Sequence, residues 1–235
     1  MLKENVEVNK MAEKNDEMTA SKKLSGFLDK NKKIFWILLI IVVCAVIAFV
    51  CAQAFGSSAK LKNLEKIDLI SYELTNDSSS LSEDELNTRR DTAIESLMAF
   101  TSKSGVVGVR ANLLAAELYY QKEDYESAIK YYEAAAKKSK TAYTSPIANY
   151  NLGVCYENLN NLEAAALAYK KASDDENYIL RTHALFSYGR VLETMGKVTE
   201  AIAAYTEVND ISPDDDWAKL AKTRAIKLQL QEKSE

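Results

Sequence analysis

Residues 151–172, NLGVCYENLNNLEAAALAYKKA, decide the fold, because the pattern inside them occurs three times along the chain. Residues 120–135, 157–172 and 193–208 align on a shared Ala-x-x-x-Tyr core. The alanines of that core are Ala128, Ala165 and Ala201, and the tyrosines are Tyr132, Tyr169 and Tyr205. The period is 37 residues and then 36, which is typical of an array of repeated helix pairs.

The residues before each copy predict the first helix of a pair. Ala116, Gly153 and Gly189 occupy one small position there. Two antiparallel helices approach closely only where one side of the contact is small, while large side chains fill the flanking grooves. Asn160 and Gly196 suit the turn inside the pair, because both residue types tolerate the left-handed conformation that ends many helices.

This combination of a small residue, a helix-turn-helix and an A-x-x-x-[FY]-x-x-A core resembles the tetratricopeptide repeat. Pro213 closes the third unit, and the resemblance covers three units at 109–213. It implies an all-α solenoid of helix-turn-helix repeats. The chain departs from the family pattern at Glu123, where a turn glycine is usual, and at Asn112 and Asn149, where an aromatic residue is usual. Two or three extra residues in each loop between repeats would explain why the spacing exceeds 34 residues.

The longest apolar run, residues 34–55, carries no charged side chain. As a helix it would extend about 33 Å, and the hydrocarbon core of a bilayer is about 30 Å thick. We therefore expect a transmembrane helix. A removable signal peptide is the alternative, because Ala52-Gln53-Ala54 resembles a cleavage site. The length of the run favours an uncleaved signal anchor, and so does the segment before it, which is long and contains six acidic residues, unlike the short basic start of a signal peptide.

Lysine counts on the two sides of this run predict its orientation. Five lysines lie shortly before it and three shortly after it: Lys22, Lys23, Lys30, Lys32 and Lys33, then Lys60, Lys62 and Lys66. Because cytoplasmic flanks carry the excess of basic residues, we expect residues 1–33 to form a flexible polar tail in the cytoplasm. The repeats would then lie outside the cytoplasm, on a single-pass protein of a bacterial inner membrane.

The repeat pattern weakens between the apolar run and the three units. Residues 56–108 are expected to form a juxtamembrane helix and a degenerate repeat unit. Its second helix is predicted at 83–103, because Ala93 lies thirty-five residues before Ala128. Its first helix is predicted at about 60–75, where apolar residues recur in steps of three or four: Leu61, Leu64, Ile67, Ile70 and Leu74. The Ser- and Asn-rich residues 75–82 connect the two.

After the three units, residues 214–235 are expected to form a capping helix, with Trp217 covering the last repeat. Two acidic clusters, 174–176 and 214–216, each precede a predicted helix. Neither has the glycine and the ligand spacing of a calcium loop, so both are expected to cap helices.

No catalytic constellation stands out, and we expect neither enzymatic activity, nor a cofactor, nor a metal. His183 is the only histidine, and no carboxylate or cysteine lies three or four residues away. A phosphate-binding glycine loop and a G-x-S-x-G motif are both missing from the sequence. Cys155 is the only cysteine after the apolar run, so it is expected to be a small buried hydrophobe.

The expected partner is a protein or a peptide. From residue 56 onward the chain has 22 Lys and Arg against 28 Asp and Glu, which opposes binding to nucleic acid. In such solenoids the first helices of successive repeats line a concave surface. The repeat register nominates ten groove residues: Arg110, Glu117, Tyr120, Tyr150, Val154, Glu157, His183, Phe186, Arg190 and Glu193. Packing is the alternative for Tyr150 and Phe186, and solvated surface is the alternative for the charged residues.

One known binding mode of the family is not expected. Tetratricopeptide domains that clamp a carboxylate present Lys and Asn at groove positions, which here hold Leu113, Tyr150 and Phe186. The order of tail, span and repeats resembles the YfgM-type ancillary subunit of the bacterial Sec translocon. That resemblance implies an interaction scaffold near the translocon and periplasmic chaperones. A scaffold for cell-envelope assembly and a non-catalytic accessory subunit or regulator of a membrane enzyme remain open.

Overall fold

The structure is a computed structural model that describes residue 22 and residues 25–138 and 144–233. The expected tail at 1–33 lies mostly outside these residues. The chain divides into two compact units, residues 1–59 and 60–235. No strand occurs in the described part of the chain.

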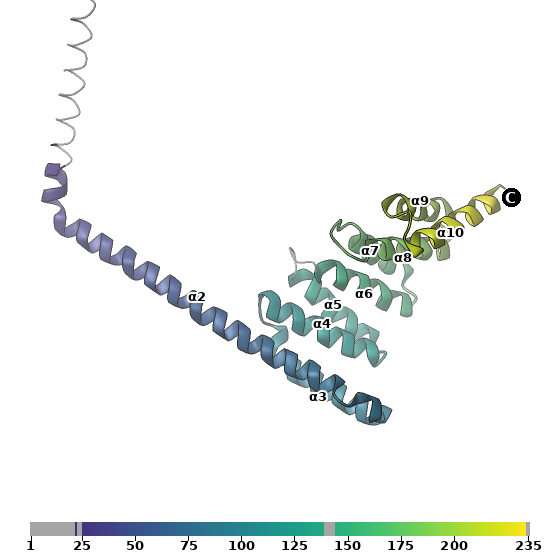
Figure 1. Cartoon of the computed structure of the whole chain (residues 1–235), viewed down its shortest axis with the longest axis horizontal. Helices are drawn as coiled ribbons and strands as arrows, with labels where there is room; N and C mark the ends of the chain where they lie inside the picture. The colour runs from purple at the N-terminus through teal and green to yellow at the C-terminus, as the bar shows by residue number, and fades with distance from the viewer. Residues whose placement is uncertain (1–21, 23–24, 139–143, 234–235) are drawn as a thin grey trace, which may run out of the picture. The chain divides into compact units, whose positions relative to one another are not determined.

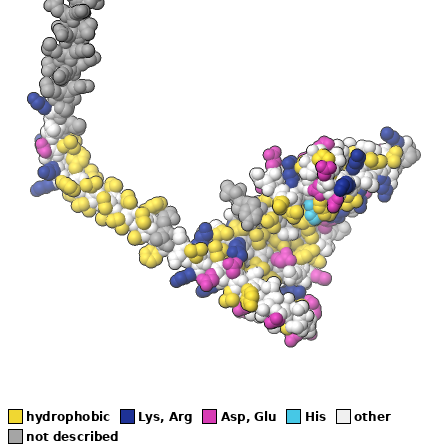
Figure 2. Space-filling model, in the orientation of Figure 1, with side chains coloured by type: hydrophobic (Ala, Val, Ile, Leu, Met, Phe, Trp, Pro, Cys, Tyr) yellow, Lys and Arg dark blue, Asp and Glu magenta, His cyan; other side chains and the backbone are white. Residues whose placement is uncertain are grey.

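Helix α2, Lys32–Thr75, contains the apolar run. Its most apolar 18-residue window has a mean hydropathy of 3.3, and none of that window is buried. By length and composition it could cross a membrane, and Figure 2 shows hydrophobic side chains covering this stretch. The helix predicted at about 60–75 is not a separate element, because α2 continues to Thr75. Gly56 is the only glycine between the two predicted helices, and residues 34–75 contain no proline, so nothing there forces a helix to end.

The second unit is an array of helix pairs (Figure 1). The pairs are α4 (Gly105–Gln121) with α5 (Tyr125–Lys138), α6 (Thr144–Asn158) with α7 (Leu162–Ser173), and α8 (Arg181–Thr194) with α9 (Val198–Ile211). Each second helix also packs against the first helix of the next pair. The all-α solenoid predicted from the repeats is confirmed.

The extra length of the repeats lies in the segments between pairs, as predicted. Inside the pairs the turns are short, such as 159–161 between α6 and α7. Between α7 and α8 the chain instead needs residues 174–180, and Tyr178 in this segment is buried.

Close helix contact depends on the two glycines of the small position. A Cβ atom on Gly153 would lie 2.6 Å from Cδ1 and Cε1 of Tyr169, and one on Gly189 would lie 2.9 Å from Cε1 of Tyr205. Both rings are buried. Each tyrosine ring of the second helix therefore fills the space that a side chain on the first helix would need.

The turn inside each pair uses a left-handed residue at the same repeat position. The φ angles are 60° at Glu123, 55° at Asn160 and 74° at Gly196. Asn160 and Gly196 were predicted for this role. Glu123 adopts the same conformation, although glycine and asparagine reach the left-handed region at a lower steric cost than glutamate.

The end of α2 packs against α3, Glu83–Thr101, which begins with a capping box between Ser82 and Glu85. A short 3₁₀ helix, η1 (Ser78–Ser80), lies in the connection. Ile67 of α2 packs into one cluster with Leu97 of α3. Of the five apolar residues predicted to share a packed face, Leu61 is the exception, because it is exposed and lies before the packed turns.

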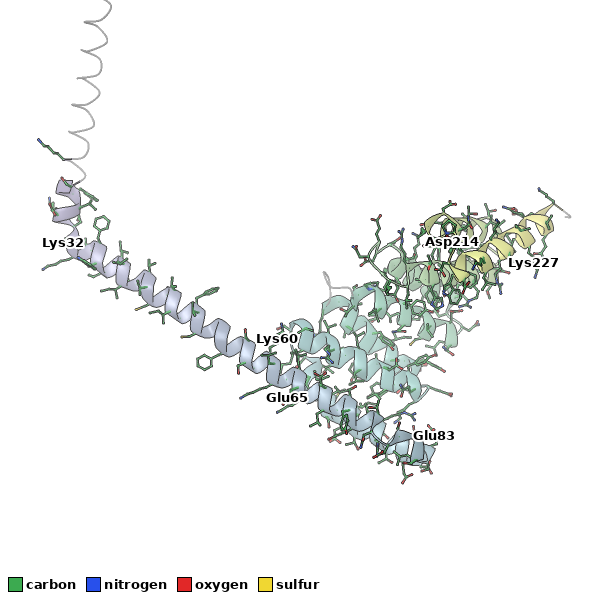
Figure 3. All side chains as sticks on the ribbon, in the orientation of Figure 1. Lys32, Lys60, Glu65, Glu83, Asp214 and Lys227 are labelled. Carbon is green, nitrogen blue, oxygen red and sulfur yellow. The ribbon has the colours of Figure 1, made fainter. Side chains whose placement is uncertain are left out.

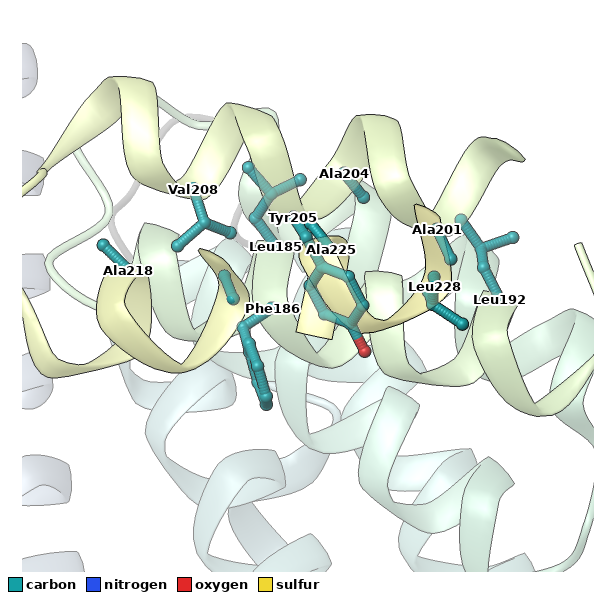
Figure 4. Packing of buried hydrophobic residues seen from close by; sticks show 11 residues of the cluster. Leu185, Phe186, Leu192, Ala201, Ala204, Tyr205, Val208, Ala218, Ala225 and Leu228 are labelled. Atoms are coloured by element: carbon teal, nitrogen blue, oxygen red, sulfur yellow. The ribbon is translucent and has the colours of Figure 1, made fainter. Parts of the chain in front are cut away.

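Helix α10, Asp216–Glu232, follows the third helix pair and packs against α9. Its buried residues join those of α8 and α9 in one cluster (Figure 4). Trp217 packs against this cluster. Asp215 caps α10 by accepting a hydrogen bond from the backbone N–H of Trp217 at 3.1 Å. The other predicted cap is wrong: Asp174 ends α7 and pairs with Lys170, while Leu180 precedes α8, because the loop is longer than the sequence suggested.

Candidate functional site

One side of the second unit is lined by the first helices of the array, namely the part of α2 after residue 60, then α4, α6, α8 and α10. We call this surface the first-helix face. Side-chain ion pairs join neighbouring members, such as Arg110 of α4 with Asp68 of α2. In Figure 3, Lys60 and Glu65 mark the part of α2 that contributes to it. All ten nominated residues belong to α4, α6 and α8.

Glu157 of α6 is the centre of a fixed polar group. Its Oε2 accepts a hydrogen bond from the Tyr169 hydroxyl at 2.6 Å. Both of its oxygens receive the Arg190 guanidinium of α8, at 2.6 and 2.7 Å. Burial, the hydrogen bond and the charge of Glu157 raise the pKa of Tyr169 far above its usual value, so the hydroxyl stays a donor. Arg190 and Glu157 thus tie α6 to α8 and hold the tyrosine ring over Gly153.

The same group recurs one repeat later. Glu193 of α8 accepts hydrogen bonds from the Tyr205 hydroxyl at 2.7 Å and from the Arg224 guanidinium of α10 at 2.9 Å. We call the two groups the Tyr-Glu-Arg ladder. Four of the nominated charged residues therefore have partners within the chain. Glu157, Arg190 and Glu193 connect neighbouring helices of the array, and Arg110 forms an ion pair with Asp68.

The first repeat departs from the ladder. The Tyr132 hydroxyl donates a hydrogen bond to Glu117 of α4 at 3.1 Å, and Gln121 donates to the other oxygen at 3.0 Å. Among the described residues no basic side chain forms an ion pair with Glu117. In α6, the first helix of the next repeat, Val154 occupies the position that Arg190 has in α8. Glu117 therefore has the tyrosine of the ladder but not its arginine.

A groove of about 660 Å³ lies on the first-helix face beside Glu117. It is lined mainly by apolar side chains of α2, α4 and α6, including Ile67, Val106, Leu113 and Ile147, with Tyr132 beneath them. This volume falls in the range of ligand-binding clefts, which are mostly apolar with a few placed polar groups. Two nominated residues, Arg110 and Glu117, line it.

An aromatic cluster occupies the other end of the first-helix face. His183 stacks on Trp217 with ring centroids 3.9 Å apart, and its Nε2 lies 3.1 Å from the Tyr150 hydroxyl. Burial lowers the pKa of His183, Arg190 lowers it further, and Asp215 opposes them. The cluster joins α6, α8 and α10 and leaves His183 and Tyr150 partly exposed.

The remaining nominated residues divide between surface and core. Tyr120 is partly exposed and packs on Tyr125. Val154 is partly exposed beside Tyr169. Phe186 is only 4% exposed and packs against Trp217 and Tyr205, so it belongs to the core and leaves the set of proposed contacts. Sequence reasoning did not nominate Val106 and Ile147, although their repeat positions place them on first helices.

Possible metal ligands do not cluster in the described part of the chain. No cluster of three or more His, Cys, Asp and Glu residues there could hold a metal ion. Cys155 is fully buried, and burial together with the charge of Glu117 raises the pKa of its thiol to about 12. It behaves as the small hydrophobe that the sequence predicted.

Comparison with protein families agrees with this geometry. One model of the tetratricopeptide repeat matches residues 88–142 and 113–178, and a second matches residues 182–215. The chain is a tetratricopeptide repeat protein. The matched residues begin within α3 and end after the third helix pair.

Among curated proteins, a TPR repeat-containing protein of Treponema pallidum (strain Nichols) is 27% identical over 137 residues. The match covers 58% of this chain and 57% of that protein, so the chain spans little more than half the length of this relative.

Solved structures share the fold. The kinesin light chain TPR-like repeats from Podosopora anserina give a TM-score of 0.56 at 10% identity, over 74% of this chain and 89% of that one. BtubC (BKLC) from P. vanneervenii gives 0.51 at 14% identity, over 78% and 87%. At these identities the likeness concerns the fold alone.

Proposed function

We propose that this tetratricopeptide protein is a membrane-anchored scaffold that holds a segment of a protein partner on its first-helix face. The observation that carries the proposal is the groove of about 660 Å³ along α4. It offers apolar side chains for burial and charged side chains, Arg110 and Glu117, at fixed places. Such a combination suits an extended segment whose side chains supply the affinity and whose charges set the register.

The ten residues nominated from the sequence serve the proposal in two ways. Arg110, Glu117, Tyr120, Tyr150, Val154 and His183 are at least partly exposed on the first-helix face and are proposed contacts. Glu157, Arg190 and Glu193 hold neighbouring helices together and are proposed contacts only at their exposed edges.

Anchoring is proposed through the apolar part of α2, residues 34–55. Its support is a mean hydropathy of 3.3 over a window with no buried residue. The excess of lysines before the span favours a cytoplasmic N-terminus and extracytoplasmic repeats. A reporter enzyme that is active only outside the cytoplasm, fused after Glu235, tests this orientation; activity of a cytoplasm-only reporter at the same site would refute it.

The proposed place of action is the Sec translocon of a bacterial inner membrane, in contact with periplasmic chaperones. Its support is the order of polar tail, span and repeats, which resembles the YfgM-type ancillary subunit. The competing assignments are a scaffold for cell-envelope assembly and a non-catalytic accessory subunit or regulator of a membrane enzyme.

Crosslinking in intact membranes distinguishes these assignments. A photoreactive residue at Val106, which is 40% exposed in the groove, would capture the bound partner. Sec subunits or secretory chaperones among the adducts are the expected result. Adducts consisting only of division proteins, outer-membrane proteins or enzymes would refute the placement at the translocon.

A further inference from the structure

The Tyr-Glu-Arg ladder is incomplete at the point where it meets the groove. In its two complete steps, Glu157 and Glu193 each bind a tyrosine hydroxyl of their own pair and an arginine of the next first helix. Glu117 binds the Tyr132 hydroxyl in the same way, although Glu117 comes from one helical turn earlier. The carboxylate is thus placed beside the tyrosine as in the other steps, but the next first helix supplies no cation.

One residue distinguishes the step at Glu117 from the step at Glu157. Arg190 and Val154 each directly follow the glycine of the small position, Gly189 and Gly153, in successive repeats. Arg190 reaches back to the preceding first helix and binds its carboxylate through both guanidinium nitrogens. Valine at 154 has neither the length nor the charge to do so. Glu117 and Tyr132 both form part of the groove wall.

Other charges near the groove are already engaged or lie elsewhere. Arg110 is paired with Asp68. Lys138 donates to the backbone carbonyl of Lys103, near the start of α4 and at the opposite end of the groove from Glu117. Arg90 contacts Gln121, the neighbour of Glu117, and its own ion pair is with Glu83. Glu117 is therefore the groove carboxylate to which the described residues bring no charge partner.

The length of the groove limits what can bind there. Along α4 it extends from Gly105 to Glu117, and twelve residue steps of helix correspond to about 18 Å. About five residues of extended chain cover that distance. Leu113 and Ile147 in the middle of the groove favour apolar side chains on such a segment.

We propose that the groove binds an extended segment of about five residues whose lysine or arginine side chain pairs with Glu117 and takes the place of the ladder's missing arginine. Apolar side chains of the same segment pack against the groove wall between Val106 and Leu113. The cation contacts a carboxylate that is already oriented by Tyr132 and Gln121, so it binds without reordering the site. This inference rests on the proposed function, because it names the chemistry of the segment that the scaffold holds.

Fluorescence anisotropy with the full chain in lipid nanodiscs tests the inference. The probes are acetylated, amidated and labelled six-residue peptides with two leucines and one lysine, and the comparison peptides carry norleucine or glutamate in place of the lysine. Empty nanodiscs provide the blank. We expect the lysine peptide to bind about tenfold more tightly than the norleucine peptide, and the glutamate peptide to bind more weakly still.

Two variants locate the effect. Glu117→Gln should abolish the preference for lysine, whereas Glu163→Gln, at an exposed carboxylate of α7, should leave it unchanged. Val154→Arg should also abolish the preference for lysine, because the new arginine would itself pair with Glu117. The helical content should stay unchanged. If Glu117→Gln still prefers the lysine peptide, the inference is overturned. It is also overturned if the wild-type chain binds the lysine and norleucine peptides equally, or binds neither of them.

Failure of the inference can be told apart from failure of the proposed function. Photocrosslinking from Val106 in intact membranes reports any partner in the groove, whatever its charge. Adducts from Val106 together with no lysine preference would refute only the inference, whereas the absence of adducts from Val106 would refute the proposed use of the groove.

Discussion

Gly153→Ala tests whether close packing of tyrosine on glycine sets the spacing of the helices. The new methyl carbon would lie 2.6 Å from two carbons of the Tyr169 ring, where ordinary contacts between carbons are about 3.5–4.0 Å. The ring is 1% exposed, and its hydroxyl is held by Glu157 at 2.6 Å. It can therefore make room only by moving against the core and by weakening that hydrogen bond.

The expected magnitude follows from opposing contributions. Overpacking a core costs about 1–3 kcal/mol, and weakening a hydrogen bond to a charged group costs about 1.5 kcal/mol or less. Replacing a helical glycine by alanine offsets about 1 kcal/mol of this loss. We expect the free energy of unfolding to fall by about 2 kcal/mol.

Urea unfolding of the full chain in detergent micelles, followed by circular dichroism, measures the change. Ala203→Gly, at an exposed position inside α9, measures the helix-propensity contribution by itself and should destabilise the protein by about 1 kcal/mol. In a Tyr169→Leu background, Gly153→Ala should lose its penalty, because the ring that it meets is gone. A Gly153→Ala variant as stable as the wild type, or more stable, would refute the packing argument.

Three further predictions concern single residues of the second unit. Glu123→Gly should raise the free energy of unfolding by about 0.5–1 kcal/mol, because Glu123 has a φ of 60°; no rise in the urea midpoint would contradict the role of that angle. The pKa of His183 is lowered in the folded protein, so the unfolded chain takes up the proton more readily and stability should fall as the pH drops from 7 through about 6.5. His183→Gln should flatten this part of the pH profile, and parallel profiles would contradict the assignment. With Cys44 and Cys51 changed to serine, the Cys155 thiol, whose pKa is raised to about 12, should react with a maleimide at neutral pH only after urea is added; rapid labelling of the folded chain would show that the thiol is accessible.

Local repetition in the sequence was enough to predict the helix pairs, because small residues and tyrosines recur at a fixed period. Gly153 and Asn160 were assigned correctly on that basis, since their roles depend on contacts within one pair. The prediction for 174–176 failed because the loop after α7 is held by buried Tyr178 and delays the start of α8. A pattern of residue types does not reveal where a long loop returns to the core.

The site was less predictable, because it depends on contacts between repeats. Phe186 aligns with Tyr150, yet Trp217 of α10 covers it and makes it part of the core. The pairing of Arg190 with Glu157 joins residues 33 positions apart and becomes visible only when the helices are stacked. Once the stacking is known, the same alignment reveals the exception at Val154.

Two-site photocrosslinking tests the central claim, that the first-helix face binds the partner, most directly. The photoreactive residue is placed at Val106 in the groove or at Leu167, which is 57% exposed on the second helix of its pair. Intact membranes carrying each variant are irradiated, and the adducts of the chain are compared. We predict a discrete adduct from Val106 and none from Leu167. Adducts from Leu167 with none from Val106 would contradict the claim and assign partner binding to the second helices.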